Sequence, residues 1–192
     1  PLVFKEDGKL LSPATFDPKL SSETSRGLEN IRFIRGIWLD NDGGDLTPED
    51  FASFLPNLRL VIWNTFSHTP EAPRWRVFIP TSLAMSVEIH KVIMNQIERQ
   101  LNKKGYWSDD DIKKNTRLKE PKAHGFDRSK FNASSLFYYP SQAKVPEHSF
   151  FCDHADGHRA PLDVLAWLKA ALIDLEGAQD CAEDKAHRQP DK

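Results

Sequence analysis

Residues 34–44 read Ile34-Arg35-Gly36-Ile37-Trp38-Leu39-Asp40-Asn41-Asp42-Gly43-Gly44, an apolar run that ends in two aspartates and a glycine pair. Successive side chains of a β-strand point to opposite faces, so Asp40 and Asp42 are expected to project from one face as the strand ends. Two carboxylates placed there can share Mg²⁺ or Mn²⁺, which take oxygen ligands. The same residues are also typical of a solvated turn, because Asp and Asn bind nearby backbone groups and Gly supplies positive φ.

The composition favours one globular domain. The chain has 192 residues, enough for a single well-packed core. Lys and Arg number 26 against 28 Asp and Glu, so any nucleic-acid surface must be a local patch. Cys152 and Cys181 are too few for a disulfide framework, which favours a reducing, cytoplasmic location. No apolar run is long enough to span a bilayer, so we expect no membrane partner.

Changes in composition and hydrophobic periodicity divide the chain into three parts. Residues 1–28 are rich in Lys, Ser, Thr and Pro and are expected to form an irregular N-terminal arm. Residues 29–178 carry the periodic segments and form the main domain. Residues 179–192 are a polar C-terminal tail or linker.

The first half of the main domain predicts the order strand, helix, strand, strand, helix. Thr47 fits an N-cap with Pro48 at the first helical position and Asp50 at the third, and Ser86 opens the second helix. This order is typical of a split β-α-β sheet with helices on one face, in an α+β fold. The expected strands are Asn30–Leu39, Leu58–Asn64 and Arg74–Ile79, with the first helix ending near Pro56.

The second half is less regular. Residues 102–125 form a long polar stretch with no sustained period, and loops of this length are usually functional or disordered. Short strands are expected at Leu136–Tyr139 and near Ser149–Cys152. The last predicted helix is Leu162–Glu176, with Leu165, Leu168, Leu172 and Leu175 facing inward.

Three further residues have the chemistry of a phosphoryl-transfer site. Asp127 precedes the strand Leu136–Tyr139 and can lie beside Asp40 and Asp42 if the two strands are neighbours. Arg74 and Arg76 are two apart on one strand and therefore share a face, where their forked donors suit phosphates. A charge ladder between strands is the alternative interpretation of this arginine pair.

Three stretches together resemble the archaeo-eukaryotic primase superfamily, and most closely the primase-polymerase domains of plasmid and phage replication proteins. They are Trp38–Asp42, Asn64–Pro80, and Phe126-Asp127 ahead of Leu136–Ser141. The resemblance spans roughly residues 35–141. It implies an RRM-like palm with a mixed sheet, and template-directed nucleotidyl transfer: a DNA primase, with DNA polymerase extension, that acts in the replication of a plasmid, phage or mobile element.

The resemblance also assigns roles to individual residues. It implies that Asp40, Asp42 and Asp127 are the catalytic residues and bind two Mg²⁺ or Mn²⁺ ions. The second motif of the family, a Ser-x-His sequence that contacts the incoming nucleotide, is altered here: Ser67 and His68 are adjacent. Arg76 stands where many relatives carry the strand histidine. Either His68 or Arg76 is therefore expected to contact the triphosphate, with Arg74 beside it.

The implied partners are a single-stranded DNA template, nucleoside triphosphates and a fused or associated helicase. Template binding is assigned to basic residues after the second helix, although an ordinary solvated loop is the default interpretation because Asp109–Asp111 interrupts them. The basic residues are Lys103, Lys104, Lys113, Lys114 and Arg117.

Two other functions use the same residues. One is a catalytically inactive, primase-like DNA-binding or replication-initiator module, and the other is a metal-dependent nuclease. Cys152, His154 and His158 have the residue types of a zinc site but offer one thiolate and no complete ligand set, so a turn around Asp156-Gly157 is preferred.

Overall fold

The computed structural model describes residues 9–114 and 123–173. Its centre is a four-stranded sheet in the order β10-β5-β6-β4. The strands are β4 (Ile37–Asp42), β5 (Leu60–Asn64), β6 (Arg74–Ile79) and β10 (Phe151–His154). All three pairings are antiparallel, so the α+β class is confirmed while the central sheet is not the mixed sheet that we expected.

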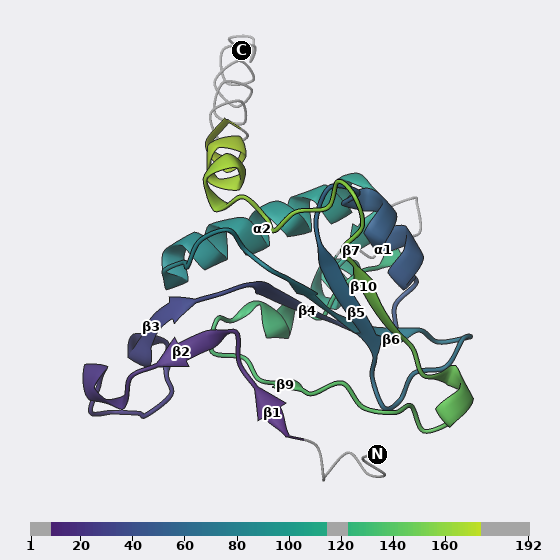
Figure 1. The fold of residues 1–192 in the computed structure, drawn as a ribbon, viewed down its shortest axis with the longest axis horizontal. Helices are drawn as coiled ribbons and strands as arrows, with labels where there is room; N and C mark the ends of the chain where they lie inside the picture. Colours follow the sequence, from purple (N-terminus) through teal and green to yellow (C-terminus); the bar gives the residue numbers. More distant parts are fainter. Residues whose placement is uncertain (1–8, 115–122, 174–192) are drawn as a thin grey trace, which may run out of the picture.

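Helices cover one face of this sheet. Figure 1 shows α1 (Pro48–Phe54) and α2 (Val87–Lys103) on one side, with β1 (Leu10–Leu11) and β9 (Phe137–Tyr138) on the other. On the helical side Phe51 packs against Trp75 and Phe126, with ring centroids 5.4 Å from Phe51 in both pairs. Trp75 is fully buried, and its Nε1 donates to the carbonyl of Leu46 at 2.9 Å.

The order β4-α1-β5-β6 forms the expected split β-α-β unit, in which β6 is hydrogen-bonded between β4 and β5. The register places Asp40 opposite Arg76 and Asp42 opposite Arg74. Directly opposed residues of antiparallel strands share a face. These four charged side chains therefore lie on the face opposite the helices.

Both helix starts follow the sequence. The hydroxyl of Thr47 accepts from the N–H of Asp50, and that of Ser86 accepts from the N–H of Ile89. Each hydroxyl satisfies a backbone donor that the first helical turn leaves free. The predicted N-caps of α1 and α2 are confirmed.

The single strand expected over Asn30–Leu39 is two strands. β3 (Ile31–Ile34) and β4 are separated at Gly36, whose φ is 88°, and a Cβ there would collide with the ring of Phe78. β3 pairs with β2 (Ala14–Phe16), and β1 pairs with β9. The N-terminal arm therefore contributes strands instead of remaining irregular.

The described parts of the polar stretch 102–125 contain regular secondary structure. α2 continues to Lys103, then β7 (Tyr106–Trp107) pairs in parallel with β8 (Ala123–His124), and α3 (Asp109–Lys114) follows β7 directly. Arg117 lies outside the described residues. The acidic run Asp109–Asp111 that interrupts the lysines forms the first turn of α3, where the helix dipole favours negative charge.

The final helix begins at Val164 and presents a different face from the one expected. Val164 and Ala171 are buried, whereas Leu165 and Leu172 are 65% and 61% exposed. Asp163 caps the helix by accepting from the N–H groups of Leu165 and Ala166. The prediction that Leu165 and Leu172 face inward is wrong. The side of the helix that packs against the core carries Val164 and Ala171, each one residue before an expected leucine. Trp167 and Leu168 also pack against the core. Leu175 lies outside the described residues.

The described ranges contain no helix with the length and apolar character needed to cross a membrane.

Candidate metal and nucleotide site

A buried ion pair joins the two strands that carry the candidate residues. Nη2 of Arg76 lies 3.1 Å from Oδ2 of Asp40, and the two side chains are 11% and 2% exposed. The Cζ of Arg76 also lies 5.9 Å from the ring centroid of Tyr138 in β9. Asp40 Oδ1 and Arg76 Nε are buried with no hydrogen-bond partner among the described residues. One carboxylate oxygen and one guanidinium N–H therefore retain the capacity for a further ligand.

Burial shifts the titration of Asp40. The pKa of Asp40 is raised from its ordinary 3.8 to about 6, chiefly by burial and in smaller part by the charge of Asp42. The guanidinium of Arg76 and the ammonium of Lys130 act in the opposite direction. Perturbed carboxylates occur often at functional sites, and here both the desolvation and the charge partners are identified.

Asp42 and Arg74 form the exposed end of the same face. Asp42 is exposed and Arg74 is half-buried. Gly43 turns the chain after Asp42 with φ 97°, and a Cβ there would lie 3.1 Å from Nε of Arg74. Glycine is favoured at this turn because of its positive φ, and it leaves room for the Arg74 guanidinium.

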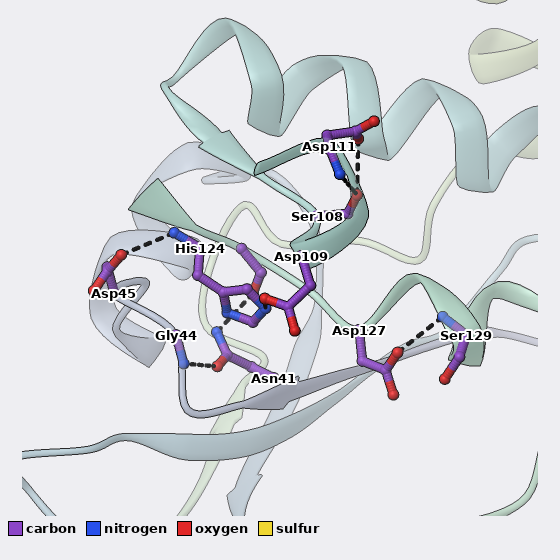
Figure 2. A network of polar contacts seen from close by, with 10 residues as sticks. Asn41, Gly44, Asp45, Ser108, Asp109, Asp111, His124, Asp127 and Ser129 are labelled. Carbon is purple, nitrogen blue, oxygen red and sulfur yellow. Dashed lines mark hydrogen bonds and ion pairs between the residues drawn. The ribbon is translucent and has the colours of Figure 1, made fainter. Parts of the chain in front are cut away.

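Asp127 reaches this region by a route that the sequence did not indicate. The strand expected to bring it there, Leu136–Tyr139, pairs with β1 instead of β4. The N–H of Asp127 donates to the carbonyl of Asp40 at 3.0 Å. Its carboxylate accepts from the N–H of Ser129 at 2.8 Å, as Figure 2 shows. The backbone of Asp127 is therefore beside Asp40, while its side chain caps the turn that follows.

A three-aspartate metal site is not assembled in the described structure. Among residues 9–114 and 123–173, no group of three or more His, Cys, Asp or Glu side chains is placed to hold a metal ion, and this includes Cys152, His154 and His158. The donor set still fits a hard cation, because Asp40 has an unpaired buried oxygen and Asp42 is exposed. Asp127 uses one carboxylate oxygen, Oδ1, to accept from the Ser129 N–H, and its metal role stays a prediction.

His68 supports the start of β6. It is 8% exposed, its Nδ1 accepts from the N–H of Arg74 at 3.1 Å, and its ring meets Phe150 edge-on with centroids 5.1 Å apart. Burial lowers the pKa of His68. The neutral ring therefore carries its proton on Nε2 when Nδ1 is the acceptor. Ser67 beside it is exposed.

The central residue of the Asp-Asn-Asp sequence has a structural role that sequence reasoning missed. Nδ2 of Asn41 donates to the carbonyls of Gly125 at 2.8 Å and Leu46 at 3.3 Å, while its Oδ1 accepts from the N–H of Gly44 at 2.9 Å. Figure 2 shows the bond between Asn41 and Gly44, with Asp127 nearby. Asn41 therefore connects the end of β4 to the segment that carries Asp127.

The predicted DNA-binding lysines occupy two helices. Lys103 and Lys104 are exposed at the end of α2, and Lys104 Nζ lies 5.5 Å from the ring centroid of Phe54. Lys113 and Lys114 are exposed in the last turn of α3. α3 is linked to the site region by a contact of 3.0 Å between Oδ1 of Asp109 and Nε2 of His124.

Lys130 is a second residue that the sequence analysis missed, since its charge acts on Asp40. It lies in the 3-10 turn Arg128–Phe131 that directly follows Asp127. Its position in the sequence could have indicated this role, because Lys130 lies three residues after the candidate residue Asp127.

Comparison with known proteins gives no relative: no family model, no curated protein and no solved structure matches this chain. Functional inference therefore depends on the geometry of the site and on the motif resemblance.

Asn41→Ala should destabilise the protein. The substitution leaves the buried Gly44 N–H and Gly125 carbonyl unpaired, at a cost of about 1–3 kcal/mol for each group. Urea unfolding measures the loss. The matched control is Asp42→Ala, an exposed neighbour on the same strand, which should change stability by less than about 0.5 kcal/mol. Equal stability of the two variants would contradict the role assigned to Asn41.

Arg76→Met should destabilise the protein more at pH 8 than at pH 5. Without the guanidinium the folded pKa of Asp40 rises above about 6. The carboxylate is then charged and unpartnered at pH 8, which costs about 3–5 kcal/mol, and this penalty fades as protonation neutralises it at lower pH. Chemical denaturation at both pH values, with Arg74→Met as the half-buried control, measures the difference. An equal loss at pH 5 and pH 8 would refute a buried charge pair.

Proposed function

We propose that residues 29–178 form the catalytic domain of a template-directed nucleotidyltransferase of the archaeo-eukaryotic primase type. The observation that carries the proposal is the register of β4 against β6, which sets two carboxylates opposite two guanidinium groups on one sheet face. The backbone bond from Asp127 to Asp40 adds the third acidic residue of the resemblance to the same neighbourhood. The reaction is primer synthesis on single-stranded DNA, with DNA polymerase extension, in plasmid, phage or mobile-element replication.

In this proposal Asp40 and Asp42 hold divalent metal, joined by the second carboxylate oxygen of Asp127, whose Oδ1 accepts from the Ser129 N–H. Bound Mg²⁺ or Mn²⁺ supplies activation of the attacking hydroxyl and neutralises the leaving pyrophosphate. Arg76 and Arg74 bind phosphate oxygens through their forked N–H groups. Lys130 adds positive charge near Asp40.

His68 has a supporting role in this proposal. Its Nδ1 is already used by the N–H of Arg74, and its ring packs on Phe150. Arg76 carries the unpaired buried N–H and lies beside Asp40. Arg76 is therefore the better candidate for the triphosphate ligand, with His68 and Ser67 at the edge of the site.

The proposed partners are a single-stranded template, nucleoside triphosphates and a fused or associated helicase. The exposed lysines at positions 103, 104, 113 and 114 are the candidates for phosphate contacts along the template.

A second function has one observation in its favour. Because no three-carboxylate group is assembled among the described residues, a primase-like DNA-binding or replication-initiator module without turnover fits the structure as it stands. A metal-dependent nuclease would use the same carboxylates on a phosphodiester.

Primer synthesis with labelled nucleotides on single-stranded templates, with Mg²⁺ and with Mn²⁺, tests the proposal. Asp42→Asn should lower the rate by more than about 100-fold, because even residues that only support metal ligands are worth 10- to 100-fold. Asp110→Asn, exposed in the acidic turn of α3, is the matched control and should retain activity.

The remaining outcomes separate the rival functions. Cleavage of DNA without triphosphates would identify a nuclease. DNA binding with neither synthesis nor cleavage in either metal would identify the inactive module. Full activity of Asp42→Asn would place the chemistry elsewhere in the chain.

A further inference from the structure

Four side chains form a row across the central sheet. Asp40 in β4 is paired with Arg76 in β6, Arg76 with Trp63 in β5, and Trp63 with Phe151 in β10. Opposed residues of antiparallel strands share a face, so all four lie on the side away from the helices. The row passes from a carboxylate and a guanidinium to an indole and a phenyl ring.

The aromatic end of this row borders a cavity of about 410 Å³. Trp63, Phe150 and Phe151 line it together with the polar residues Ser141 and Gln142. Aromatic walls with a few polar groups are typical of small-molecule sites, and this volume is in their usual range. The cavity is large enough for a flat heteroaromatic ring.

Two aromatic residues of the sheet that line the cavity each have an unusual feature. Phe151 is 61% exposed, although it lies in a strand of the central sheet. Trp63 is 2% exposed, and its Nε1 is buried with no hydrogen-bond partner among the described residues. A buried indole N–H usually finds a partner, so the unpaired Nε1 of Trp63 is an exception in a residue that lines the cavity.

The cavity and the arginine pair lie at neighbouring positions along the same sheet face. Arg76 and Phe151 are separated by two strand spacings, about 10 Å, comparable with the span from the phosphates of a nucleotide to its base. The segment from Tyr138, which packs over Arg76, to Ser141 at the cavity follows the same row. His68 contacts both ends, through the Arg74 N–H and the ring of Phe150.

We propose that this cavity is a nucleobase-binding subsite, in which Phe151 stacks on the base and the phosphates of the same nucleotide bind Arg74 and Arg76. The inference rests on the proposed function for the identity of the phosphate site. Every base has a π-face, so aromatic stacking of this kind tolerates sequence variation. In this proposal the bound base is that of the incoming nucleotide. A base of the single-stranded template could stack on Phe151 in the same way.

Equilibrium titration with deoxynucleoside triphosphates, tripolyphosphate and a single-stranded oligonucleotide, each in Mn²⁺, tests the subsite. Phe151→Ala should weaken triphosphate binding at least about fivefold and leave tripolyphosphate unchanged, because it removes one base stack and no phosphate contact. Phe151→Trp should restore affinity. Phe33→Ala, another exposed aromatic on a strand, is the matched control.

Each other outcome has a defined meaning. A loss for the oligonucleotide alone retains the subsite and assigns its base to the template. Unchanged affinity for both, or an equal loss for tripolyphosphate, overturns the proposal. The titrations need no turnover, so a protein that fails to make primers can still bind bases here. A protein that makes primers with Phe151→Ala unimpaired refutes the subsite alone.

Discussion

The pairing of Asp40 with Arg76 is the interaction on which the rest of the site depends. It lies within the β4–β6 ladder, which also sets Asp42 opposite Arg74, while the β5–β6 ladder sets Trp63 beside Arg76. Removing two charges from water costs several kcal/mol per ion. The attraction between the charges offsets this cost only when their geometry is good. Here burial raises the pKa of Asp40 to about 6 even though the arginine opposes that rise. A buried ion pair of this kind is weak evidence that the pair stabilises the fold. It is stronger evidence for a functional site.

The surrounding structure keeps this pair in place from both sides. Behind it, Trp75 and Phe126 pack with Phe51 in the core, and Asn41 connects β4 to Gly125. In front, Phe137 packs against Trp38 with centroids 5.4 Å apart, and Tyr138 lies over Arg76. The charged groups are consequently held between a rigid core and a short strand. Preorganised charge in a dry environment acts more strongly than the same charge in water.

Local signals in the sequence predicted the local structure well. Thr47 and Ser86 begin their helices as expected, and alternation along 74–79 placed Trp75 in the core and Arg74 and Arg76 on the other face. The misses have long-range causes. The apolar run across Gly36 hid a change of direction, and the side of the last helix that packs depends on partners far away in the chain.

The approach of Asp127 to Asp40 illustrates the same limit within the site. Sequence reasoning could single out Asp127 as a candidate, but its contact with Asp40 is a backbone hydrogen bond rather than a strand pairing. No periodicity encodes such a contact. The structural role of Asn41 was hidden for a related reason, because its partners are two carbonyls and one N–H, none of which has a sequence signature.

The central claim is that Asp40 and Asp42 bind a divalent ion beside Arg76. Anomalous diffraction from crystals soaked in Mn²⁺ and a deoxynucleoside triphosphate tests it directly. The account predicts a manganese peak with carboxylate oxygens of Asp40 and Asp42 at about 2.0–2.6 Å, and a triphosphate against Arg76. A bound nucleotide with manganese only at the acidic turn Asp109–Asp111, or no manganese near Asp40, would contradict it.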